Sequence, residues 1–109
     1  MKKPRKNPPG HLSKEARKLW LDILLEYDIS DAAGLRILRV ALEAYDRCQA
    51  AREQIKRDGM TFADRVGQIK SHPLLPVERD SRAAFLAGLK ALNLDLEPSH
   101  DKPGRPAGS

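Results

Sequence analysis

The sequence has little cysteine, few aromatic residues and no long hydrophobic run. Its single cysteine, Cys48, excludes a disulfide within the chain and any zinc site built on several cysteines. Because only 5% of the residues are aromatic, a core must consist mainly of Leu, Ile, Val and Ala. No stretch of about 20 apolar residues is present to span a bilayer. The basic N-terminus also lacks the apolar segment of a secretory signal, so we expect a cytoplasmic protein without a membrane partner.

The sequence also lacks the motifs of the common enzyme classes. It contains no glycine-rich phosphate-binding loop, no serine nucleophile elbow and no paired-histidine zinc motif. The histidines, His11, His72 and His100, fall in three separate connecting segments. Nothing pairs them with Cys48, which we expect to be a packed thiol within a helix. We therefore predict a protein that is not an enzyme and that holds no cofactor or metal.

Positive charge is in excess and is concentrated near the N-terminus. The chain has 20 Lys and Arg against 15 Asp and Glu, a formal net charge of +5. A cationic arm beside the start of a helix suits a phosphate backbone, because neutralised phosphates release their counterions. Seven cations in the first eighteen residues are therefore the candidate DNA contacts: Lys2, Lys3, Arg5, Lys6, Lys14, Arg17 and Lys18.

The same cations have a simpler interpretation, which is that they only keep the protein in solution. They are not interleaved with aromatic residues that could stack on bases, and no recognition-helix motif accompanies them. The cluster thus supports affinity for DNA but gives no basis for sequence specificity.

Two segments poor in hydrophobic residues flank the part of the chain that can fold. Residues 1–10 are rich in Lys, Arg and Pro, and we expect them to form a disordered basic arm. Residues 97–109 are rich in Pro, Gly and Ser, and we expect a flexible tail. Residues 11–96 are expected to form an all-α, three-helix domain. Its predicted elements are helices over 13–27, 31–58 and 75–92, and extended segments or a small hairpin over 60–70.

The long central helix has apolar side chains on two sides. Leu35, Leu38, Leu42 and Tyr45 form a bulky row, and a second row of mostly small side chains follows a heptad rhythm. Small side chains allow another helix to approach closely, so we expect the second row to pack against another copy of the chain. The alternative is that the other helices of the same chain cover both rows. The second row consists of Ile37, Ala41, Ala44, Cys48, Ala51 and Ile55.

Several short motifs occur in an order that resembles a known family. The segment Pro8–Ala16 (PPGHLSKEA) precedes a helix that contains Trp20, and the segment Gly67–Pro73 (GQIKSHP) precedes the last helix. Over residues 8–96, the chain resembles the small subunits of phage terminases, in particular the short class found beside large terminase genes in tailed phages and prophages. The other segments that carry the likeness are Ala44–Arg47, Gly59–Thr61, Glu78–Arg82 and Leu92–Leu94.

The resemblance implies a DNA-packaging component without enzymatic activity. Such subunits are helical protomers of a ring-shaped homo-oligomer, which engages viral double-stranded DNA in the bacterial cytoplasm and delivers it to the large terminase subunit. The large subunit carries the ATPase and nuclease, which agrees with the lack of a phosphate-binding loop here. The chain departs from the family pattern because no compact helix-turn-helix domain is evident at its N-terminus.

Four residues of the segment before the last helix carry the family motif: Gly67, Lys70, His72 and Pro73. We expect them to be structural. Gly67 permits a tight bend, and the pair His72-Pro73 fixes how the chain enters the last helix, because a residue before proline is pushed toward extended geometry. Lys70 is expected to be exposed.

Two other functions fit the same residues. A small helical scaffold could use its basic arm to bind an acidic protein surface. A dimeric DNA-binding regulator would need a recognition helix, for which we find only Arg36 and Arg39 as base-reading candidates. Both lie beside apolar rows, which makes them poor readers of bases.

Overall fold

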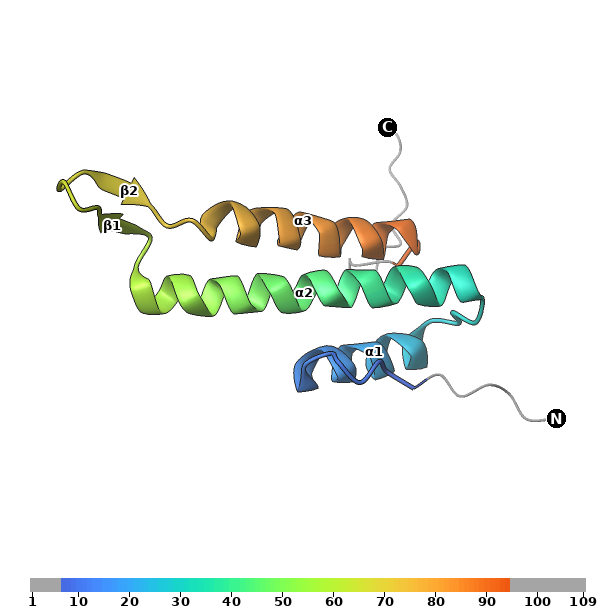
Figure 1. Cartoon of the computed structure of the whole chain (residues 1–109). Coiled ribbons are helices and arrows are strands. Elements are labelled where there is room, and N and C mark those ends of the chain that lie inside the picture. Colours follow the sequence, from blue (N-terminus) through green and yellow to red (C-terminus); the bar gives the residue numbers. More distant parts are fainter. Residues whose placement is uncertain (1–6, 95–109) are drawn as a thin grey trace, which may run out of the picture.

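The computed structural model describes residues 7–94, which form three helices and one β-hairpin (Figure 1). In chain order these are α1 (Lys14–Glu26), α2 (Ala32–Asp58), β1 (Thr61–Ala63), β2 (Ile69–Ser71) and α3 (Leu75–Ala91). Both α1 and α3 run antiparallel to α2, and the hairpin projects beyond the end where α2 finishes (Figure 1). This mainly helical architecture with a small hairpin confirms the expected fold class.

Local sequence signals set the limits of the first two helices. The hydroxyl of Ser13 accepts a hydrogen bond from the backbone N–H of Ala16 (3.0 Å) and so caps α1. Asp31 does the same for α2 by accepting from the N–H of Gly34 (3.0 Å). At the other end of α2, Gly59 has a φ of +87°, a conformation that favours glycine, and the helix stops there.

One part of the core lies between α1 and the first half of α2. Its buried side chains come from the segment before α1, from α1 itself and from the bulky row of α2. The aromatic rings of Tyr45 and Phe85 extend this core to α3, with their centroids 5.2 Å apart. The buried cluster is Leu12, Ala16, Trp20, Leu38 and Leu42.

The second row of α2 packs against α3 of the same chain. An added Cβ at Gly88 of α3 would lie 2.7 Å from the Cβ of Ala41, so the two helices are nearly in backbone contact there. Helix α3 thus covers the buried members of this row within one chain, as in the alternative that the sequence left open. Ala41, Ala44, Cys48 and Ala51 are buried, whereas Ile37 and Ile55 are partly exposed.

The hairpin is exposed on both faces. β1 and β2 pair antiparallel, with Phe62 opposite Lys70 and Ala63 opposite Ile69. Every strand residue is exposed to solvent. An isolated two-stranded hairpin is marginally stable in water, so the chain must hold this one at its base.

Candidate nucleic-acid interface

The segment that leads into α1 is fastened to the middle of α2. The carboxylate of Asp46 accepts hydrogen bonds from the backbone N–H of Ser13 (2.8 Å) and from its hydroxyl (2.6 Å). One turn away, the Nε2 atom of His11 lies 2.7 Å from a carboxylate oxygen of Glu43. This contact with His11 is the main cause that holds the pKa of Glu43 below its usual range. These contacts fix where the basic start of α1 sits on the molecule.

Arg17, one of the expected DNA contacts, has a structural task as well. It is half-buried, and its Nη1 atom donates hydrogen bonds to the carbonyl oxygens of Leu12 (2.8 Å) and Gly10 (3.3 Å). The side chain therefore ties Gly10 and Leu12 to the first turns of α1, and Gly10 belongs to the arm that we expected to be disordered. Its guanidinium places a positive charge beside the start of α1.

The other two cations of α1 are open to solvent. Lys18 forms an ion pair with Asp22 at 3.1 Å, yet its side chain is 74% exposed. Lys14 is exposed and makes no ion pair within residues 7–94. Helical spacing places Lys14, Arg17 and Lys18 on one flank of α1, as the sequence predicts. The remaining candidate contacts, Lys2, Lys3, Arg5 and Lys6, lie outside the described residues, as does the expected tail over 97–109.

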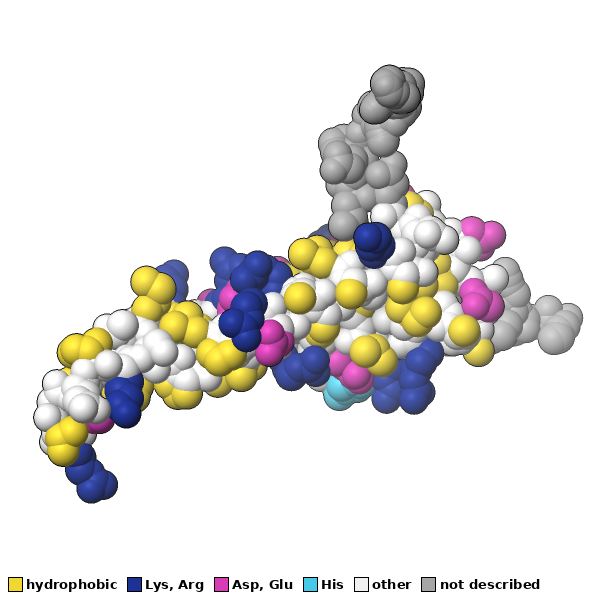
Figure 2. Space-filling model, turned by 90° about the horizontal axis from the view of Figure 1, so that it is seen from above, with side chains coloured by type: hydrophobic (Ala, Val, Ile, Leu, Met, Phe, Trp, Pro, Cys, Tyr) yellow, Lys and Arg dark blue, Asp and Glu magenta, His cyan; other side chains and the backbone are white. Residues whose placement is uncertain are grey.

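α2 presents a second set of cations, which the prediction of a basic N-terminal arm did not include. Some of them are engaged: Arg39 lies 3.3 Å from Glu43, and Arg57 donates to the side chain of Gln54. On the face that Figure 2 shows, basic side chains gather in patches with acidic side chains among them. Their repetition along α2, at positions that belong to neither apolar row, was the available signal. These exposed cations are Arg36, Arg39, Arg47, Arg52, Lys56 and Arg57.

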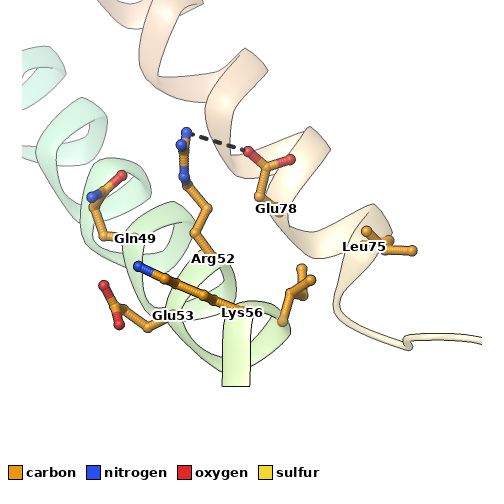
Figure 3. A pocket seen from close by; sticks show the side chains of 7 residues that line it. Gln49, Arg52, Glu53, Lys56, Leu75 and Glu78 are labelled. Atoms are coloured by element: carbon orange, nitrogen blue, oxygen red, sulfur yellow. Dashed lines mark ion pairs between the residues drawn. The ribbon is translucent and has the colours of Figure 1, made fainter. Parts of the chain in front are cut away.

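A shallow groove of 430 Å³ runs between the end of α2 and the start of α3 (Figure 3). One of its acidic groups, Glu78, is held by basic side chains. The carboxylate of Glu78 accepts two hydrogen bonds from Arg82 (3.1 and 3.2 Å) and lies 4.0 Å from Arg52. The Arg82 hydrogen bond is the main cause that lowers the pKa of Glu78. Glu53 and Lys56 also line the groove, and both are exposed to solvent.

Cys48 packs beside this groove as an unreactive thiol. Its Sγ atom donates to Glu78 at 3.6 Å. Burial is the main cause that raises the pKa of Cys48, so the nucleophilic thiolate is disfavoured. Within residues 7–94, no three His, Cys, Asp or Glu side chains gather into a metal site. No helix in that part of the chain is long and apolar enough to cross a membrane.

The motif that carried the family resemblance builds the hairpin and its attachment. Gly67 has a φ of +84° in the hairpin turn, and its N–H donates to the carbonyl of Asp64 (2.9 Å). Lys70 is exposed and pairs with Asp64 at 3.6 Å. His72 is buried at the base of the hairpin, and the exposed Pro73 follows it just before α3.

A family model described as phage terminase, small subunit, matches residues 14–100. The chain belongs to this family. The match covers every helix and strand of the described fold. Searches of curated proteins and of solved structures give no match.

Terminase small subunits take part in phage DNA packaging, so viral DNA and the large terminase subunit are the partners that the family implies. The family is generally non-catalytic.

Proposed function

We propose that this terminase small subunit is a non-enzymatic, DNA-binding adaptor. In the bacterial host cytoplasm, a ring-shaped homo-oligomer of the chain engages viral double-stranded DNA and delivers it to the large ATPase/nuclease subunit. Family membership supports the packaging role. The excess of positive charge, +5 over the chain, supports the contact with DNA.

The observation that carries the DNA contact is the cationic flank at the start of α1. Lys14, Arg17 and Lys18 lie together there, on a segment that Asp46 and Glu43 tie to α2. The four arm cations precede this flank directly in the sequence. A row of up to seven cations on one part of each protomer binds phosphates without reading bases.

Salt dependence of DNA binding tests this assignment. Two variants remove expected contacts: K2A/K3A/R5A/K6A and K14A/K18A. The matched control R79A/K90A removes two exposed cations from α3. The slope of log affinity against log salt should fall by roughly one unit for each phosphate that a variant no longer neutralises, and the control should keep the wild-type slope.

Equal slopes for the wild type, both variants and the control would remove the α1 flank and the arm from the mechanism. If the chain binds the large subunit but does not bind duplex DNA at low salt, the result would instead favour the alternative function, a small helical scaffold that binds an acidic protein surface.

A further inference from the structure

The hairpin exposes more apolar surface than such a small element normally leaves in water. Val66 is 78% and Ile69 71% exposed. Met60 and Phe62 are exposed as well, but Phe62 pairs with Lys70 and so lies on the face opposite Ile69. Figure 2 shows hydrophobic side chains spread over this end of the molecule. Exposed apolar side chains gathered on one small element mark an interaction site.

The same hairpin carries positive charge. Arg65, in the turn between β1 and β2, makes no ion pair within the described part of the chain. Lys70 has Asp64 as its partner, but one oxygen of that carboxylate already accepts from the backbone N–H groups of Val66 and Gln68. The partner surface should therefore be apolar and acidic.

The second half of α1 has this complementary character. Leu21 and Leu25 stand one turn apart on α1 and are exposed, Leu25 to 88%. Asp22 and Glu26 alternate with them and, together with Leu25, line a shallow depression of 440 Å³. Asp28 follows directly after the helix and is exposed. We call this leucine pair with its acidic border the α1 face.

The hairpin cannot reach the α1 face of its own chain. The α1 face lies before the first residue of α2, and the hairpin follows the last one. A helix of 27 residues separates them by about 40 Å, and the hairpin projects away from the helices (Figure 1). Its strands and turn, of about five residues on each side, extend only about 17 Å.

We propose that the hairpin of one copy docks on the α1 face of a second copy. Val66 and Ile69 cover Leu21 and Leu25, and Arg65 approaches Asp22 and Glu26. The two surfaces differ, so the contact is head-to-tail, and its repetition forms a ring when the rotation closes. The inference specifies the interface of the proposed oligomer and rests on that part of the proposed function, but it requires no DNA.

Complementation between two defective variants of the full-length chain tests the proposal. V66D/I69D disables the hairpin, and L21D/L25D disables the α1 face. All four side chains are exposed, so circular dichroism and the urea midpoint should stay near the wild-type values. V40D/L86D, which changes two exposed apolar residues elsewhere, is the matched control.

Light scattering without DNA should show an oligomer for the wild type and the control. Each defective variant alone should be monomeric at concentrations roughly tenfold above the wild-type midpoint of assembly. Their mixture should form a one-to-one dimer and nothing larger, because it has one intact hairpin and one intact α1 face per pair. Charge reversal adds a second readout: R65E and E26R should each weaken assembly, and R65E/E26R should recover it.

The proposal is overturned by a monomeric wild type, by a hairpin variant that assembles normally or by a mixture that stays monomeric. It is also overturned when V66D/I69D abolishes binding of the large subunit and leaves the oligomer intact, since the hairpin then serves that partner. An assembled wild type that does not bind DNA would refute the proposed DNA contact and leave this interface standing.

Discussion

At the scale of single residues, His72 shows how one buried side chain joins separate segments. Its Nδ1 atom accepts a hydrogen bond from the backbone N–H of Leu74 (3.0 Å), so the ring proton must lie on Nε2. The Nε2–H group then donates to Asp58, the last residue of α2, at 2.9 Å. The backbone N–H of His72 donates to the carbonyl of Met60 (2.7 Å). The ring thus ties the end of α2 to the start of α3 across the base of the hairpin.

Replacement of His72 should destabilise this junction. The variant H72A leaves the N–H of Leu74 without its acceptor in a part-buried place, which costs up to about 1–3 kcal/mol. The matched control is H11A, which breaks an exposed pair with Glu43 and should cost at most about 1 kcal/mol. Urea unfolding measures both, and equal destabilisation by the two variants would contradict the role given to His72.

At the scale of elements, the contact between α2 and α3 depends on the lack of a side chain at Gly88. Glycine within a helix normally costs about 1 kcal/mol relative to alanine, so G88A would stabilise a helix that stood alone. Here the added Cβ would lie 2.7 Å from that of Ala41, which forces the helices apart. Close packing should therefore outweigh the intrinsic preference for a helix.

We expect G88A to lower the free energy of unfolding by about 1–3 kcal/mol. A87G, at the neighbouring exposed position, tests the helix preference separately and should cost about 1 kcal/mol. The double variant A41G/G88A removes the opposing methyl group and should recover part of the stability. A more stable G88A would show that the two helices separate without cost.

The sequence predicted the elements well because the signals that end helices are local. Ser13, Asp31 and Gly59 act on backbone groups within a few residues, and the observed helix limits differ from the expected ones by at most one residue. The partner of the small-residue row was not predictable in this way. Periodicity shows that Ala41 and Ala44 face an apolar neighbour, but it does not say which helix supplies that neighbour.

The candidate site was predictable to a smaller extent. Charge and helical spacing placed Lys14 and Lys18 on one exposed flank of α1. The bonds of Arg17 to two carbonyl oxygens depend on how the preceding loop folds back, and residue types alone do not encode that path. The exposure of the apolar hairpin was not predictable from the sequence either. Val66 and Ile69 are exposed because no element in the described part of the fold covers them.

At the scale of the whole molecule, three carboxylates join parts of the chain that are distant in sequence. Glu43 contacts His11, Asp58 contacts His72, and Glu78 contacts Cys48. Each carboxyl has a pKa below its ordinary value. The main cause is the hydrogen bond with His11 for Glu43 and the hydrogen bond from Arg82 for Glu78. For Asp58 the hydrogen bond from Gln54 is the largest cause, followed by the one with His72. The folded chain therefore binds these protons less readily than the unfolded chain does.

A depressed pKa in the folded state contributes stability that is complete above the unfolded value and disappears as the pH falls. For Glu78 the ordinary value is 4.5, so the urea midpoint should decrease as the pH is lowered through and below that point. E78Q should show a shallower decrease, whereas E53Q, a change at an exposed position on the groove, should follow the wild type. A midpoint independent of pH in this range would contradict the contribution of the three lowered pKa values to stability.

The uninterrupted course of α2 has a geometric consequence for any assembly. Each residue of an α-helix adds 1.5 Å of rise and about 100° of rotation, and α2 is the connection between the α1 face and the hairpin. Its 27 residues therefore set both the distance and the relative angle between the two docking surfaces. Inserting one residue into α2 would rotate one docking surface relative to the other about the helix axis. Inserting seven residues would nearly restore the original angle but would increase the distance between the two surfaces.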